Sequence, residues 1–167
     1  NQWFSHGVNQ RYAHEIAHQY WGNQVMIASR EENWISEGFA QYASALAMRA
    51  GKGEGQFNTI MASWASKSGD QAPLGTIPTQ WRARDLGGYA GYSLRWAMLY
   101  GKGPVLLHHI HKEVGDQAFV TLMRSFQKSL KGRPGTTQDL INLLKLIVKK
   151  DYTDFFEQHL WGTAMLR

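Results

Sequence analysis

Two histidines and two glutamates stand at spacings that suit metal-assisted hydrolysis. His14, Glu15 and His18 form an HExxH segment, and Glu37 follows after eighteen further residues. On a helix, residues i and i+4 lie on one face a turn apart, so both imidazoles can bind one zinc ion at roughly 2.0–2.1 Å. Glu15 projects about a quarter turn away. Its carboxylate is then free to act as the general base on a water molecule.

Glu37 is the candidate third ligand. It lies in segment 34–40, Trp-Ile-Ser-Glu-Gly-Phe-Ala, which predicts the start of a second helix against the first, where Gly38 and Ala40 permit close approach. Three protein ligands leave the fourth position of a tetrahedral zinc site open, as in catalytic sites. The chain has no cysteine, so histidine and carboxylate are its only strong zinc donors. The sequence therefore predicts one catalytic Zn²⁺ held by the two histidines and Glu37.

These segments resemble the zinc signature of a known enzyme family. Residues 14–23, His-Glu-Ile-Ala-His-Gln-Tyr-Trp-Gly-Asn, and 34–40 are similar to the signature of the gluzincin aminopeptidases, the aminopeptidase N family. A third segment, 100–107, resembles the family's Tyr-x-Lys-Gly stretch. The resemblance implies that Tyr100 stabilises the oxyanion of the tetrahedral intermediate. A phenol hydroxyl can fill this role because it donates a hydrogen bond to a carbonyl oxygen as negative charge grows there.

The resemblance covers nearly the whole chain and implies its fold. We expect residues 1–167 to form a single all-α domain, the helical lobe of a thermolysin-like zinc peptidase catalytic domain. Family members also have an upstream Gly-x-Met-Glu-Asn strand that holds the amino end of the substrate, and residues 1–13 contain no such motif. We therefore expect the sequence to be a fragment of a longer chain, lacking the upstream β subdomain and contacting the remaining domains of its own chain.

The function implied is that of a zinc metallopeptidase, in the first place an aminopeptidase that removes N-terminal residues from peptides, with Glu15 as base. Two alternatives stay open: a thermolysin-type endopeptidase and a non-catalytic scaffold of the same fold. The scaffold is disfavoured because the candidate ligands, Glu15 and Tyr100 are all intact. As an isolated lobe, the fragment is expected to have weak activity or none. The sequence leaves substrate preference and cellular compartment open.

Composition argues against a membrane span in this sequence and against nucleic acid as a partner. Of the 167 residues 43% are hydrophobic and 13% aromatic, which favours a globular domain, and no apolar run approaches the eighteen or so residues that a membrane span needs. The net charge is +5. Because the basic residues are interleaved with apolar positions at helical spacing, solvated helix faces explain this charge better than a nucleic-acid site.

Apolar periodicity predicts a series of helices, at 8–20, 35–49, 54–66, 94–114, 117–130, 138–149 and 153–161. Ser36 is predicted to cap the second of these, and Thr136 with Asp139 forms an acidic capping box. Residues 66–91 contain two prolines and five glycines, and predict a long irregular loop.

His108, His109 and His111 are candidates for a second metal site. His108 and His111 share a helix face, but Glu113 is the one acidic residue beside them. Roles in packing or on the helix surface are therefore favoured. The solitary His6 and His159 predict no function.

Overall fold

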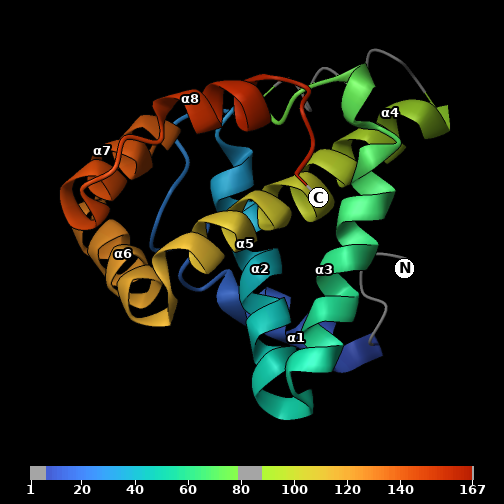
Figure 1. Ribbon diagram of the computed structural model, residues 1–167, viewed down its shortest axis with the longest axis horizontal. Coiled ribbons are helices and arrows are strands. Elements are labelled where there is room, and N and C mark those ends of the chain that lie inside the picture. The colour runs from blue at the N-terminus through green and yellow to red at the C-terminus, as the bar shows by residue number, and fades with distance from the viewer. Residues whose placement is uncertain (1–6, 79–87, 167) are drawn as a thin grey trace.

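The computed structural model describes residues 7–78 and 88–166, and this part of the chain contains helices and no strand (Figure 1). The α-helices are α1 (Gly7–Ala17), α2 (Asn33–Lys52), α3 (Glu54–Gly69), α4 (Gly88–Ala97), α5 (Gly103–Val114), α6 (Asp116–Ser129), α7 (Thr137–Val148) and α8 (Thr153–Phe156). A 3₁₀ turn spans Ala72–Leu74, and π-helical turns span Met98–Lys102 and Glu157–Trp161. The all-α prediction is confirmed.

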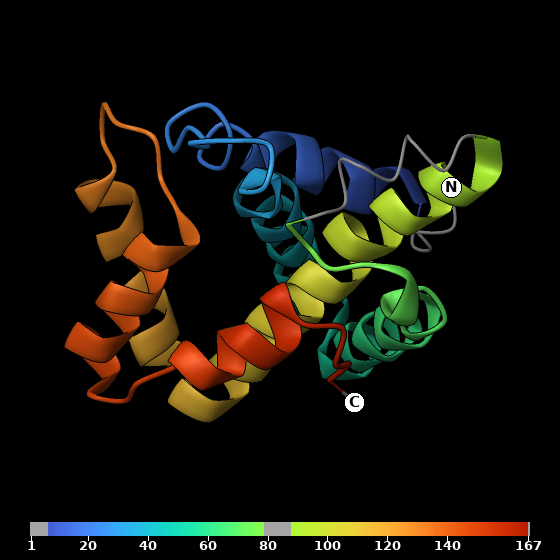
Figure 2. The same cartoon turned by 90° about the horizontal axis from the view of Figure 1, so that it is seen from above.

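Helix α2 is the centre of the packing. It contacts α1, α3, α5 and the π-helical turn Met98–Lys102. Most of its first half is buried, and the fully buried Trp34 and Ile35 lie there. Figure 2 shows α6 and α7 together at one end of the molecule and α3 and α4 at the other, with α5 running between them. The helix that carries Glu37 is therefore held on several sides at once.

The segment predicted as one helix, 94–114, is two α-helices joined by a π-helical turn. α4 passes into the turn Met98–Lys102 and then into α5 without leaving the helical conformation. A π-helical turn inserts an extra residue into a helix and shifts the faces on either side, and such turns recur at functional sites. Tyr100 lies in the middle of this turn.

Gly38 was expected to allow the helix that carries Glu37 to approach the preceding helix, and its contacts differ from that prediction. A Cβ atom at this position would lie 3.5 Å from the carbonyl oxygen of Leu99 and 3.6 Å from the Cα of Gly103. The small residue thus allows α2 to approach the π-helical turn and the start of α5, and not α1 as predicted. This close approach brings Glu37, its neighbour in sequence, towards Tyr100.

The predicted cap at Ser36 is wrong. α2 begins at Asn33, so Ser36 lies inside the first turn, and the preceding Glu32 makes no capping hydrogen bond from its side chain. The Glu32 carboxylate instead accepts hydrogen bonds from the backbone N and Oγ1 of Thr137, at 2.9 and 2.5 Å. At the start of α7, Thr136 and Asp139 form the predicted capping box.

The predicted loop 66–91 is shorter than expected at both ends. α3 continues to Gly69, the 3₁₀ turn Ala72–Leu74 follows, and α4 begins at Gly88. Residues 79–87 of that prediction lie outside the described residues. Among the helices that the structure describes, none is both long enough and apolar enough to cross a bilayer.

Candidate metal centre

His14, His18 and Glu37 converge where α1 packs on α2. One ligand atom from each lies within 4.8 Å of the others, and in the described part of the chain this is the one group of three residues with such geometry. Nε2 of each histidine is 3.5 Å from Oε2 of Glu37, and the two Nε2 atoms are 3.0 Å apart. His14 is buried, while His18 and Glu37 are partly exposed. The predicted ligands thus face one another, with access from solvent.

The backbone after α1 orients the imidazole of His18. Nδ1 of His18 donates a hydrogen bond of 2.8 Å to the carbonyl oxygen of Trp21. This hydrogen bond orients the ring and directs Nε2 at the cluster, and in the neutral imidazole Nε2 then carries the lone pair, as in metal sites where the second ring nitrogen donates to a carbonyl. Ser36 Oγ donates to the same carbonyl at 3.3 Å. Sequence reasoning missed the part of Trp21 in this arrangement, because a backbone carbonyl leaves no signal in residue type.

Gly22 allows the tight turn that places this carbonyl. Its φ angle is +116°, a conformation that residues with a Cβ rarely adopt. Its amide donates to the carbonyl of Val25 at 2.9 Å. A Cβ at Gly22 would lie 2.7 Å from Ser36 Oγ. The turn and the polar contacts around His18 therefore depend on each other.

The charge state of Glu37 suits a metal ligand. Burial acts to raise the pKa of Glu37, but hydrogen bonds from His14, His18 and Tyr100 outweigh it and hold that pKa well below its usual range. The same hydrogen bond with Glu37 raises the pKa of His18. Two imidazole nitrogens and one ionised carboxylate are a donor set that zinc accepts, and they leave a coordination position open. The residues present therefore fit one zinc ion.

Tyr100 reaches the cluster from the π-helical turn. Its hydroxyl donates a hydrogen bond of 2.5 Å to Oε2 of Glu37. Its ring stacks on His14, with centroids 5.3 Å apart, and on Trp96, with centroids 4.1 Å apart. Burial, with the nearby charge of Glu37, raises the pKa of Tyr100. The phenol therefore keeps its proton and can donate a hydrogen bond at neutral pH.

Glu15 lies beside the cluster and not in it. Its side chain is more than half exposed, and Oε1 is 3.9 Å from Nε of Arg11 one turn earlier. Its negative charge raises the pKa values of both His18 and Tyr100. The carboxylate is thus near enough to these two side chains to influence their charge, without being one of the converging ligands.

Among the described residues, the other histidines form no group that could hold a second metal ion. His111 is buried, with Nδ1 2.7 Å from the Tyr42 hydroxyl and Nε2 2.8 Å from Oδ1 of Asp116. Burial lowers the pKa of His108 to about 4, and that of His111 is lowered by the same cause. No third ligand joins them among the described residues. The packing interpretation is therefore favoured for these two. His6 lies outside the described residues.

Comparison with known proteins agrees with this geometry. The Peptidase family M1 domain matches residues 5–159. The chain is 25% identical over 157 residues to aminopeptidase N of Lactococcus lactis subsp. lactis, and 25% identical over 151 residues to endoplasmic reticulum aminopeptidase 2 of Homo sapiens. An M1 zinc metallopeptidase of Deinococcus radiodurans, solved with a Tyr-Ser-Ala substrate, has the same fold with a TM-score of 0.76 at 24% identity.

The matches differ in how much of each protein they include. They cover 87% and 84% of this chain but 17% and 15% of the two curated relatives. For the solved structure, the match covers 96% of this chain and 35% of the other. The chain thus spans a small part of the length of its relatives. Because the family match includes most of the sequence, with both zinc-signature segments and segment 100–107, the chain belongs to peptidase family M1.

Proposed function

We propose that this chain carries the catalytic centre of a zinc-dependent aminopeptidase. The observation that carries the proposal is the convergence of His14, His18 and Glu37 within 4.8 Å, with Tyr100 hydrogen-bonded to the same carboxylate. The three converging residues would hold one zinc ion, Glu15 would be the general base, and Tyr100 would stabilise the oxyanion. Both curated relatives are aminopeptidases by name, and the structural relative is a zinc metallopeptidase.

The mechanism follows from what each side chain can do. When bound, zinc supplies Lewis acidity, polarising the scissile carbonyl and lowering the pKa of a water molecule towards ~7. Glu15, whose carboxylate is free of the ligand cluster, takes the proton of the attacking water and passes it to the leaving amine. Tyr100 keeps its proton at neutral pH, and so can donate a hydrogen bond to the carbonyl oxygen as charge develops there.

We further propose that the natural protein is longer than these 167 residues and that its substrate site is completed by other domains of its own chain. The chain matches only 17% and 15% of the length of the two curated relatives, which supports this proposal. So do three exposed apolar side chains at i, i+4 spacing on α1, Val8, Tyr12 and Ile16, with the exposed Tyr20 in the turn that follows the helix. An intact mass of the protein purified from its source tests the proposal, since a mass of 19.0 kDa would contradict it.

Peptide hydrolysis is tested on the full-length protein with paired substrates. We expect cleavage of peptides with a free amino terminus and none of their N-acetylated forms. Cleavage of the blocked peptides alone would favour the thermolysin-type endopeptidase, and no cleavage of either by the zinc-loaded protein would favour the non-catalytic scaffold.

The Glu15→Gln variant tests the base. General acid–base catalysis typically contributes ~10²–10⁴-fold to the rate. The kcat of the variant should therefore decrease by a factor in that range, while its zinc content is unchanged. Glu157→Gln is a matched control, because it also neutralises an exposed carboxylate but lies in the turn after α8. Full activity of Glu15→Gln would exclude this residue as the base.

A further inference from the structure

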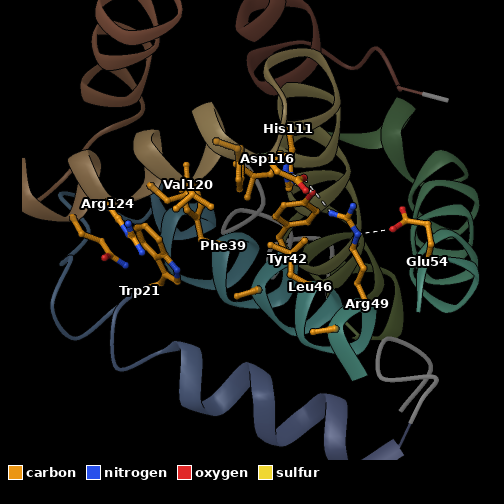
Figure 3. A pocket seen from close by; sticks show the side chains of 16 residues that line it. Trp21, Phe39, Tyr42, Leu46, Arg49, Glu54, His111, Asp116, Val120 and Arg124 are labelled. Atoms are coloured by element: carbon orange, nitrogen blue, oxygen red, sulfur yellow. Dashed lines mark hydrogen bonds and ion pairs between the residues drawn. The ribbon is translucent and has the colours of Figure 1, made fainter. Parts of the chain in front are cut away.

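A groove between α2 and α6 is separate from the candidate metal centre (Figure 3). Its volume is about 730 Å³, within the ~300–1,000 Å³ typical of ligand sites, and none of the candidate zinc ligands lines it. The walls are apolar, with Phe39 and Leu46 on α2 facing Phe119, Val120 and Met123 on α6. Val120 is 45% exposed, although valine is among the residue types most often buried.

One end of this groove is acidic. Arg49 lies between two carboxylates, with Nε 2.5 Å from Oε2 of Glu54 and Nη1 3.3 Å from Oδ1 of Asp116. His111 contacts Asp116 as well, but burial lowers its pKa, so it adds no charge at neutral pH. The charged side chains that line this end of the groove are one guanidinium and two carboxylates, which leave a net negative charge, and Lys112 lines a smaller adjoining cavity. Figure 3 shows these side chains together at one end of the groove.

The other end is basic. Arg124 lies there beside Trp21, and its side chain is exposed (Figure 3). Gln127, one turn further along α6, adds a neutral amide to this end. Among the described residues, no carboxylate pairs with Arg124. The groove thus has an apolar middle with opposite charges at its two ends.

The distance between the ends fits a short peptide. Asp116 and Arg124 are eight residues apart on α6, which corresponds to about 12 Å along the helix axis at ~1.5 Å per residue. An extended peptide advances ~3.3 Å per residue, so three or four residues span this length. Apolar side chains would then lie against the aromatic and aliphatic walls.

We propose that this groove binds a short apolar peptide with free ends, its ammonium group at Glu54 and Asp116 and its carboxylate at Arg124. A fatty acid would satisfy the apolar walls and Arg124, but would leave the acidic end without a partner. The opposite charges at a matching separation therefore select a zwitterionic ligand. The proposal does not depend on the zinc centre, and its test needs no catalysis.

The test is calorimetric titration of the full-length protein in EDTA, which prevents zinc-dependent cleavage of the probe. The probes are Leu-Phe-Leu, its N-acetyl form, its C-terminal amide and dodecanoate. We expect Leu-Phe-Leu to bind most tightly, with each blocked form about three- to five-fold weaker, the size that one solvent-exposed ion pair supports. Arg124→Gln should weaken Leu-Phe-Leu by the same factor and leave the binding of its amide unchanged.

Three further variants show whether the binding belongs to the groove. Lys128→Gln removes an exposed positive charge one turn along α6 and should leave all affinities unchanged. Val120→Trp fills the groove and should weaken Leu-Phe-Leu at least ten-fold, whereas His14→Ala at the metal centre should not affect it. Equal affinity for free and blocked peptides, tighter binding of dodecanoate, or no heat at millimolar peptide would overturn the proposal. A dimer in solution that Val120→Trp dissociates would also overturn it, because a second copy would then occupy the groove.

Discussion

The hydroxyl of Tyr100 donates a hydrogen bond of 2.5 Å to Oε2 of Glu37, and that oxygen is also 3.5 Å from the Nε2 atoms of both histidines. The same carboxylate oxygen is thus shared by the candidate oxyanion donor and the candidate metal site. A hydrogen bond to this oxygen competes with its use as a metal ligand, since both draw on its lone pairs. Tyr100 is therefore expected to affect metal affinity and catalysis in opposite directions.

The variant Tyr100→Phe tests this relationship. Loss of one oxyanion donor typically costs ~10²–10³ in kcat, so activity of the full-length protein should fall by that factor. Zinc affinity, measured by competition with a chelator, should be at least as tight as in the parent because the competing hydrogen bond is gone. Tyr89→Phe is the control, since Tyr89 is 77% exposed on α4. Zinc loss that parallels the loss of activity would show that Tyr100 has a structural role.

Zinc should stabilise the fold through the three candidate ligands. A ligand present at one hundred times its dissociation constant contributes about 2.7 kcal/mol, so thermal unfolding should shift to higher temperature when zinc is added. His18→Ala and Glu37→Gln should each abolish most of that shift. His159→Ala should retain it, because His159 lies in the turn after α8, away from the cluster. An undiminished shift in both ligand variants would place the zinc site elsewhere.

The parts of the site that sequence could predict are those set by local helix geometry. The i, i+4 spacing of His14 and His18 predicts two imidazoles on one face whatever the rest of the chain does. The position of Glu37 depends on how α1 crosses α2, for which the sequence offers only an apolar surround. Tyr100 lies sixty-three positions after Glu37, so local geometry cannot place it, and only the family resemblance predicts its role.

The parts that escaped prediction rest on backbone groups and on a change in helix type. The carbonyl of Trp21, which orients His18, belongs to the main chain, so the residue type at this position does not predict its role. Ser36 has the character of a cap, but it hydrogen-bonds to this carbonyl from inside the helix. The π-helical turn at Met98–Lys102 is also hidden, because its apolar spacing resembles that of an ordinary helix.

Gly22→Ala should destabilise the protein through two effects that can be separated. The backbone conformation at φ +116° disfavours any side chain, and the new Cβ would meet Ser36 Oγ at 2.7 Å. Together we expect a loss of roughly 1–3 kcal/mol in the free energy of unfolding, measured with urea. The double variant Gly22→Ala with Ser36→Gly should recover the steric part only. Full recovery would mean that the backbone conformation costs nothing, and no recovery would mean that the contact with Ser36 is irrelevant.

Lys102 should give the protein a stability that rises with pH above neutrality. Burial lowers its pKa from 10.5 to about 8, and Nζ donates to the carbonyl oxygen of Gly162 at 2.8 Å. Below pH 8 both states hold the proton, and the full penalty for burying the charge is present. Between about pH 8 and 10.5 the unfolded state keeps a proton that the folded state releases, so the folded state gains stability as pH rises.

Urea unfolding at pH 7.5 and 9.5 should show this rise in the free energy of unfolding of the parent and its loss in Lys102→Met. Lys128→Met, on the exposed face of α6, should keep the rise. The same pH slope in Lys102→Met and the parent would assign the effect to other groups.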